Sequence, residues 1–501
     1  MDATKIGVVI ALLIVIGVPF LFRPEEAAVP ANAERLIIIT PHNEQICYEF
    51  GRAFSDWHER EHGTPAHVDW RTPGGTSEIR KQLEASYAAA LREGKIDREG
   101  NLAEGQSMSF DLMFGGGSYD HGKLVRFSAL IDDERVAVPI SQPVRFEDDW
   151  FEATYGENDI SGEPLYHPEK YWCDTALSAF GIVYNRDALA SIGIEEAPVV
   201  WADLTDYRYF TWIGLANPAQ SGSIMTTYDA ILRRMGWVEG WQVLRRCAAN
   251  SRYYAASSSK VPIDVSQGAA AAGMCIDFYG RYQSQAVLDA AHGDELAYGD
   301  RVGYVDPPNL TAIDADPISL LRGAPHRDLA ERFVEFCLTD EAQALWQFPR
   351  TEEGLGPRQF ELRRMPVKRS MYRDYGERFR DQVNPFELAE PFENTDRNVR
   401  SMIAILFSSM AMDIHEDMQA AWRALNEEED EAVRAEMLAL FDALPVHITA
   451  EGEELDLAEQ ANLGAIVEDI GSVRNRADDV RLAYTTFFRE NYREIVALAQ
   501  R

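Results

Sequence analysis

Residues 36–43 read LIIITPHN, an uncharged apolar run of strand length that stops at a proline and leads into a helix. The following helical pattern places Phe50, Phe54 and Trp57 on one face and stops at Gly63. The same order of strand, turn and helix recurs over residues 67–92, and a further strand at 111–114 runs into three glycines. This alternation predicts an α/β fold with a mostly parallel sheet covered by helices on both faces.

A second α/β region follows the first without a linker. Strands are predicted over residues 178–184, 209–216 and 269–278, with a helix over 224–235 between them. The segment 327–346 is amphipathic and predicts one helix. Beyond about residue 351 the chain is rich in Arg, Glu and Ala, with helical periodicity clearest over 399–425 and 428–444. We therefore expect helices that cap the α/β body.

Three glycine-rich loops each end a predicted strand and open a predicted helix. Glycine lets the backbone approach a ligand, and a helix start offers unpaired N–H groups at the positive end of its dipole. In open α/β sheets the ligand crevice lies beyond the carboxyl ends of the strands. Ordinary turns with Ser or Thr caps are the alternative interpretation. The predicted ligand-binding residues in these loops are Gly74, Gly75, Thr76, Gly116, Gly117, Ser118, Ser221, Gly222 and Ser223.

Three further residues stand at strand ends that we expect to face the same cleft. These residues are His42, Tyr279 and Arg281. Each of them can equally be a satisfied structural residue, so they are candidates for ligand contact on position alone.

The composition excludes some functional classes. The chain has 501 residues and a formal net charge of −34, so its surface repels nucleic-acid phosphates at long range. Its 46% hydrophobic and 11% aromatic residues are too many for a disordered acidic chain. Five cysteines are scattered without CxxC spacing, which favours buried thiols over a disulfide scaffold, with one or two disulfides as the alternative.

The N-terminal segment predicts export. Residues 6–22 form an uncharged apolar run, near the lower length limit for a membrane-spanning helix. The sequence Ala31-Asn32-Ala33 resembles a signal-peptide cleavage site but lies far beyond the run. We therefore interpret residues 1–33 as either a signal peptide or a membrane anchor, and the rest of the chain as periplasmic or extracytoplasmic.

An ordered set of short motifs resembles the extracellular solute-binding proteins of ABC importers, in the family-1 group that includes ferric-iron and phosphonate binders. The set covers about 34–370 and comprises residues 36–50, 74–77, 111–117, 181–185, 216–223, 277–279 and 330–343. The resemblance implies two α/β lobes joined by a hinge, with the ligand in the cleft. We expect residues 34–135 and 305–350 to form lobe 1 and residues 136–304 to form lobe 2. Residues 351–501 would be a helical C-terminal region packed on the lobes.

Two alternatives to this interpretation involve metals. Ferric binders of the family use a pair of tyrosines where this chain has Phe278 and Tyr279, and a phenylalanine offers no oxygen to a hard cation. The segment His58-Glu-Arg-Glu-His62 is an HExxH string, the helix motif of zinc proteases, but Gly63 ends the helix at once and no third ligand is evident. A ferric-iron carrier and a membrane-anchored zinc peptidase thus remain as alternatives.

Our prediction is a non-enzymatic, monomeric solute-binding protein without a cofactor that delivers its solute to an ABC permease and its ATPase subunit. Surface charge is screened over about 8–10 Å in physiological salt, whereas helix dipoles inside a cleft are screened far less. Three helix starts, together with Arg281 if it faces inward, would make the cleft locally positive. We therefore expect a small polar solute bearing a phosphate, phosphonate or carboxylate, with a neutral solute as the alternative.

Overall fold

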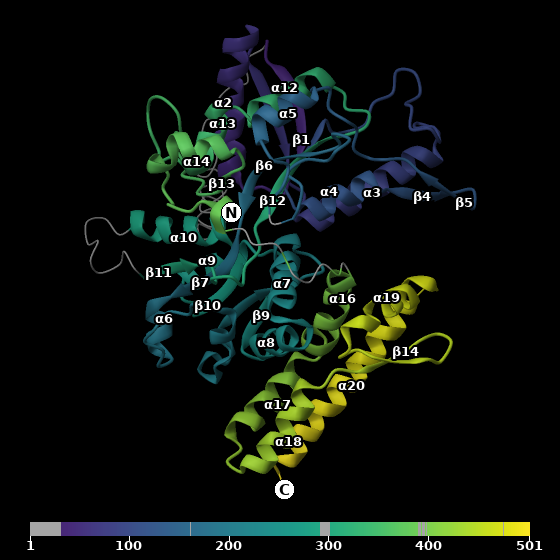
Figure 1. Cartoon of the computed structure of the whole chain (residues 1–501), viewed down its shortest axis with the longest axis vertical. Coiled ribbons are helices and arrows are strands. Elements are labelled where there is room, and N and C mark those ends of the chain that lie inside the picture. The colour runs from purple at the N-terminus through teal and green to yellow at the C-terminus, as the bar shows by residue number, and fades with distance from the viewer. Residues whose placement is uncertain are drawn as a thin grey trace, which may run out of the picture.

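The computed structural model describes residues 32–160, 162–290, 301–388, 392, 396, 398–473 and 475–500. The predicted apolar segment at 6–22 lies outside these residues. Among the helices that are described, none is both long and apolar enough to cross a lipid bilayer. Two α/β lobes lie one above the other, and a helical extension packs below the second lobe (Figure 1).

The first lobe is built on a six-stranded sheet. β1 pairs in parallel with β2 and β3, whereas β12 and β13 run antiparallel to their neighbours. Leu36 and Ile38 of β1 pack on one face of the sheet and Ile39 on the other, because successive side chains of a strand alternate. In spatial order the strands are β13 (Met365–Pro366), β6 (Cys173–Ser178), β12 (Asp314–Leu320), β3 (Leu112–Phe114), β1 (Glu34–Ile39) and β2 (Ala66–Arg71).

Helices cover both faces of this sheet. One face carries α2 (Glu44–His62), α5 (Asp148–Tyr155), α12 (Arg327–Cys337) and α13 (Asp340–Gln347). The other face carries α3 (Thr76–Arg92) and α4 (Ser118–Val125). The lobe is completed by the hairpin β4 (Ser128–Ile131) and β5 (Glu134–Ala137), and by α14 (Arg369–Tyr375), η3 (Gly376–Arg378) and α15 (Pro385–Leu388).

The second lobe is built on a five-stranded sheet of mixed direction. β8 lies parallel to β9 and β10, and β7 lies antiparallel to β10 and β11. In spatial order the strands are β11 (Val302–Val305), β7 (Phe180–Asn185), β10 (Ala272–Ile276), β8 (Ile213–Ala216) and β9 (Ser251–Ala255). The helices are α6 (Arg186–Ser191), η1 (Trp201–Thr205), η2 (Tyr207–Tyr209), α7 (Gly222–Met235), α8 (Trp237–Ala249), α9 (Lys260–Ser266) and α10 (Asp277–Ala290).

Two crossover segments join the lobes and correct two expectations. β6 leads through Ala179 into β7, and residues 306–313 lead from β11 back to β12. The Thr311 hydroxyl lies 2.7 Å from the Phe180 carbonyl and accepts the Phe180 N–H at 3.0 Å, so the crossovers bond to each other. After these crossovers β7 runs antiparallel to β10 and β11, and β12 runs antiparallel to β3 and β6, so the sheets are mixed instead of mostly parallel. β6 also lies in the first sheet, although it falls within the predicted lobe 2 range of 136–304.

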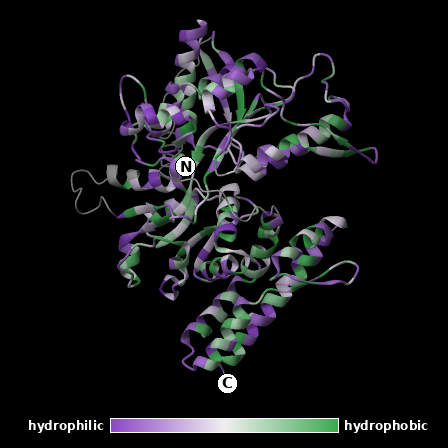
Figure 2. Cartoon of the chain, in the orientation of Figure 1, coloured by the Kyte–Doolittle hydropathy of each residue, from purple (hydrophilic) through white to green (hydrophobic). Residues whose placement is uncertain are grey.

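The C-terminal residues form the expected helical region, except that β13 at Met365–Pro366 belongs to the first sheet. The helices of this extension share one continuous apolar core with the second lobe. Figure 2 shows apolar strands within both lobes and helices of mixed polarity in the extension. The extension comprises α16 (Asn398–Phe407), the π-helical turn η4 (Ser408–Met412), α17 (His415–Glu427), α18 (Glu431–Asp442), β14 (Val446–Ile448), β15 (Glu454–Asp456), η5 (Gln460–Asn462), α19 (Leu463–Ser472) and α20 (Arg476–Leu498).

All five cysteines are buried free thiols. This confirms the interpretation of the cysteines as core residues. Burial raises the pKa of the Cys47 thiol to about 12, which keeps it protonated and unreactive.

Candidate functional site

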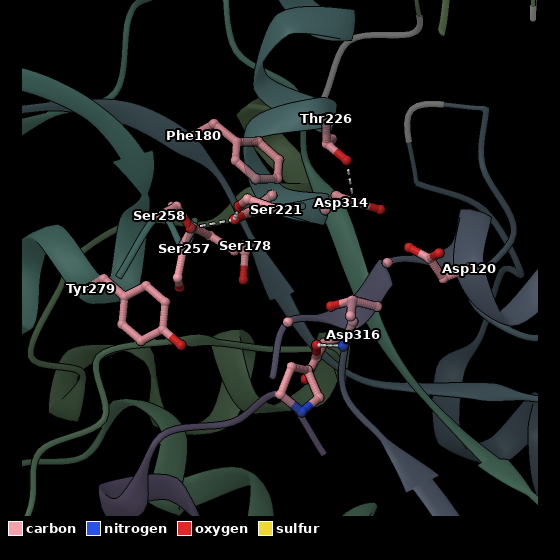
Figure 3. Close-up of a pocket in the computed structure, with 18 of the residues that line it drawn as sticks. Asp120, Ser178, Phe180, Ser221, Thr226, Ser257, Ser258, Tyr279, Asp314 and Asp316 are labelled. Atoms are coloured by element: carbon pink, nitrogen blue, oxygen red, sulfur yellow. Dashed lines mark hydrogen bonds between the residues drawn. The ribbon is translucent and has the colours of Figure 1, made fainter. Parts of the chain in front are cut away.

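A cleft of about 750 Å³, including the part open to solvent, lies between the two lobes. The loops that follow β1 and β3 and the start of α3 form its first-lobe wall. The start of α7 and the loop after β9 form its second-lobe wall, and the strand ends next to the crossovers supply Ser178, Phe180 and residues 314–316. Figure 3 shows these side chains arranged around the opening, with the hydroxyl of Tyr279 directed into it.

The glycine-rich loops bring the two walls close together. A Cβ atom added to Gly75 would lie 3.0 Å from the Gln220 carbonyl oxygen, across the cleft. One added to Gly222 would lie 3.5 Å from the Thr76 side chain and 3.6 Å from Asp120 Oδ2. Gly116 has a φ of +105°, a backbone conformation that side chains other than glycine rarely adopt. Glycine at these positions therefore permits the close approach of the lobes.

Three helices begin at the cleft. The N-cap residues of α3 and α4 are Gly75 and Gly117, which have no side chain to accept from the first-turn N–H groups. The N-cap of α7 is Ser221, whose hydroxyl accepts from Ile224 N at 3.5 Å, a long bond. Donors at a helix start favour negative charge, so each of these ends can receive an anionic or polar group.

Asp316 lies on the cleft floor in a buried ionic network. Its Oδ2 is 2.8 Å from His42 Nε2 and 2.9 Å from Arg364 Nη1, and its Oδ1 accepts from Gly116 N at 2.8 Å. Burial acts to raise the pKa of Asp316, but the charges of Arg364 and His42 and these hydrogen bonds hold it below the ordinary value. Asp316 is therefore ionised, and its charge is matched by the protein.

Asp314 lies beside this network in a different state. Its Oδ2 accepts from the Thr226 hydroxyl at 3.3 Å, and its Oδ1 accepts from Ala315 N at 2.9 Å. Burial raises the pKa of Asp314 to about 6, against the lowering effect of Arg400. A carboxyl group whose pKa lies this close to neutral pH can accept a hydrogen bond from a solute hydroxyl when ionised, or donate one when protonated.

The second-lobe wall is rich in hydroxyl groups. Ser221 Oγ lies 3.2 Å from Ser223 Oγ, which lies 2.6 Å from Ser258 Oγ. Ser257 and Gln220 also line the cleft on this side. Such groups donate and accept equally well, which suits a polyhydroxylated solute.

Nine of the twelve predicted site residues line the cleft. These nine are His42, Gly75, Thr76, Gly116, Gly117, Ser221, Gly222, Ser223 and Tyr279. Gly74 and Ser118 are not among the lining residues, although each adjoins one that is. Whether the nine contact a solute stays a prediction.

The expectation that Arg281 faces the cleft is wrong. Its Nη2 is 2.5 Å from Asp306 Oδ2, its guanidinium lies 5.4 Å from the centre of the Tyr304 ring, and its Nη1 is 3.9 Å from Asp381. Arg281 lies just after the first turn of α10, and its side chain points toward β11 and Asp306 instead of toward the cleft. Arg281 therefore forms a buried structural ion pair with Asp306.

Several lining residues had no signal in the sequence. Arg364 precedes β13 and Arg400 lies in the extension, both far along the chain from the glycine-rich loops. Asp314 and Asp316 belong to β12, which was not predicted as a strand. No motif marks these positions, since tertiary packing alone brings them to the cleft.

The HExxH string does not form a metal site. His58 is fully buried, with Nδ1 2.7 Å from the Thr64 carbonyl oxygen and Nε2 3.0 Å from Arg332 Nη1. A guanidinium beside Nε2 repels a metal cation, and both ring nitrogens already have partners. Within the described ranges, no three His, Cys, Asp or Glu side chains are grouped to hold a metal ion.

Residues 153–351 match the family model for bacterial extracellular solute-binding proteins. Over 183 residues the chain is 27% identical to a protein of Haemophilus influenzae, covering 36% of this chain and 49% of that one. Over 177 residues it is 23% identical to the phosphoglycerate transport regulatory protein PgtC of Salmonella typhimurium, covering 34% of this chain and 39% of PgtC. The matches thus span less than half the length of these curated relatives.

A solved structure shares the fold. The periplasmic binding protein AfuA of Actinobacillus pleuropneumoniae, solved with fructose-6-phosphate bound, matches with a TM-score of 0.51 and 15% identity over 78% of this chain and 97% of AfuA. The helices at the C-terminus lie beyond what such matches cover. The chain therefore has the two-lobed fold of a periplasmic binding protein, and its residues 153–351 resemble the bacterial extracellular solute-binding proteins.

Proposed function

We propose that this protein captures a small anionic organic solute, with a phosphate, phosphonate or carboxylate group, in the cleft between its lobes. Closure of the lobes around the solute would create the form that an ABC permease, with its ATPase subunit, recognises. This role is extracytoplasmic, in keeping with the family and with the apolar segment at residues 6–22.

The observation that carries the proposal is the distribution of charge around the cleft. The starts of α3 and α7 and the guanidinium groups of Arg364 and Arg400 line it. The negative charges of two cleft carboxylates are balanced by arginines, since Asp316 pairs with Arg364 and Asp120 accepts from Arg80 at 2.7 Å. The cleft can therefore accept an anion although the whole chain carries a net charge of −34.

The names of the similar proteins point in the same direction. PgtC is named for phosphoglycerate transport, and the AfuA structure holds fructose-6-phosphate. Both names contain a phosphorylated organic solute with free hydroxyl groups. The serine-rich wall and Asp314 of this chain offer partners for such hydroxyls.

The ferric-iron alternative has less support. Of the described residues that line the cleft, Tyr279 is the only tyrosine, and Phe278 lines the cleft beside it. The Arg364 guanidinium lies 4.6 Å from the centre of the Phe278 ring. Arg364 also pairs with Asp316 at 2.9 Å, so this carboxylate is already engaged and is not free to bind a cation.

Calorimetric titration of the purified protein tests the proposal. The probes are fructose 6-phosphate, 3-phosphoglycerate, fructose, spermidine and ferric citrate, each at the same ionic strength. We expect at least one phosphorylated probe to bind about 100-fold more tightly than fructose, because two charge-assisted hydrogen bonds contribute about 3 kcal/mol or more. Tight binding of spermidine or iron, with no phosphorylated probe bound, would contradict the proposal.

A further inference from the structure

Arg400 reaches the cleft from the C-terminal extension. It lies in the first turn of α16, and only 12% of its side chain is exposed. Its Nη1 donates to the Thr226 hydroxyl at 3.1 Å and is 3.9 Å from Asp229 Oδ2. Its guanidinium also lies 4.5 Å from the centre of the Tyr119 ring.

These contacts join the two lobes. Val399, Met402 and Ile403 of α16 are buried in the same core as Tyr228 of α7, so α16 belongs with the second lobe. Tyr119 lies on α4, which packs on the first sheet. An opening of the cleft therefore separates Arg400 from Tyr119, and closure brings them together.

The charge of Arg400 is only partly matched by the protein. Asp229 already pairs with Arg233 at 3.0 Å, and the Nε of Arg400 is buried without a hydrogen-bond partner. Asp314, the other nearby carboxyl group, is bonded to Thr226 and Ala315. A buried guanidinium whose Nε has no hydrogen-bond partner favours an additional anion.

We propose that the extension completes the binding site: Arg400 contacts the anionic group of the bound solute and holds the closed lobes together through Tyr119. The inference rests on the proposed function and deepens it. Arg400 lies in the C-terminal helices, which extend beyond what the solved-structure matches cover, so this contact belongs to the extension of the chain. The extension is thereby part of ligand recognition and not only a support for the second lobe.

Substitution in the full-length chain tests this role. Removing the extension is unsuitable, because it shares its core with the second lobe. We choose Arg400→Gln, which loses the charge, and Arg400→Lys, which keeps the charge but loses the planar fork. The matched control is Arg423→Gln, because Arg423 lies in the extension and stacks 5.2 Å from the Phe210 ring centre, away from the cleft-lining residues.

Each variant is titrated with fructose 6-phosphate, 3-phosphoglycerate and fructose, and its fold is checked by circular dichroism. We expect Arg400→Gln to weaken binding of the phosphorylated probe about 10- to 100-fold without changing the affinity for fructose. Arg400→Lys should fall between this variant and the wild type, and Arg423→Gln should match the wild type. If Arg400→Gln does not fold, the selective loss is read from Arg400→Lys.

The outcomes separate this inference from the proposed function. A wild type that prefers a phosphorylated probe, together with an unchanged Arg400→Gln, overturns the role of Arg400 and leaves the proposed function intact. Equal losses for phosphorylated and neutral probes would show that Arg400 only supports the fold. A wild type that binds spermidine or ferric citrate tightly and no phosphorylated probe contradicts both.

Discussion

Asp316 joins three segments of the chain at one point on the cleft floor. Its carboxylate contacts His42 after β1, Gly116 after β3 and Arg364 before β13. All three side chains in this network are nearly or fully buried. Because a buried charge is costly without its partner, Asp316 and Arg364 stabilise the cleft floor only as a pair.

Replacement of Asp316 by asparagine tests this network. Asp316→Asn leaves the buried guanidinium of Arg364 without a counter-charge, and we expect a loss of about 3–5 kcal/mol in the free energy of unfolding. Urea denaturation followed by circular dichroism measures the change. The control is Asp374→Asn, whose exposed pair with Arg373 should leave the denaturation midpoint unchanged. An equally small effect of both substitutions would contradict the network's role.

The residues of the site were predictable where backbone chemistry marks them. Glycines and small hydroxyl residues between a strand and a helix carry a local signal, and seven of these nine loop residues line the cleft. An arginine carries no such local signal, because its long side chain can pair with a carboxylate that is distant in the sequence. Arg281 was predicted from its position and is paired with Asp306, whereas Arg364 was missed and lies in the cleft.

The start of α3 is the element that sets how far the lobes can close. Gly75 has a φ of −73° and a ψ of 168°, which any residue can adopt, so glycine is not needed there for the backbone. It is needed for space, because a Cβ atom would lie 3.0 Å from the Gln220 carbonyl oxygen of the opposite lobe. A side chain at this position acts on closure and not on the folding of the lobe.

We therefore expect Gly75→Leu to separate binding from stability. The affinity for the phosphorylated probe should fall at least about tenfold, because overpacking costs about 1–3 kcal/mol in the closed form. The free energy of unfolding without ligand should change by less than about 0.5 kcal/mol. Calorimetry and urea denaturation measure the two quantities. Gly376→Leu is the control, since nothing lies within 4 Å of the Cβ position at Gly376. Unchanged affinity in Gly75→Leu would rule out the close approach of residue 75 to Gln220 in the closed form.

The presence of helices and strands was predictable from local hydrophobic periodicity, but the breaks between consecutive elements were not. The strand predicted at 178–184 corresponds to β7, but its first residue ends β6, which passes through Ala179 into β7 and was not predicted. The predicted helix at 327–346 divides at Thr339, whose hydroxyl accepts from Ala342 N and caps α13. The predicted helix at 399–425 is interrupted by the π-helical turn Ser408–Met412, before α17 begins at His415. Hydrophobic periodicity continues through each joint, so it cannot locate the break.

At the scale of the whole molecule, the second lobe and the extension share one apolar core. Apolar residues of β7, β8, α7 and α8 and those of α16–α20 belong to a single continuous core. Phe407 at the end of α16 shows the contact: its ring centre lies 4.8 Å from that of Tyr228 and 5.6 Å from that of Tyr254. The sequence indicated helices that cap the body, but it could not show that the two cores merge.

Truncation of Phe407 tests whether the two parts unfold together. Phe407 is fully buried, so Phe407→Ala should remove about 3–5 kcal/mol from the free energy of unfolding. Hydrogen exchange measures this loss in each element, and we expect it to be equal in α7 of the lobe and in α20 of the extension. Leu482→Ala is the control. Leu482 lies in α20 and is 66% exposed, so this substitution should change the free energy of unfolding by less than about 0.5 kcal/mol. A cooperative core transmits a loss of stability to every element it contains. A loss of protection confined to α16–α20, with α7 protected as in the wild type, would therefore mean that the extension unfolds as a separate domain.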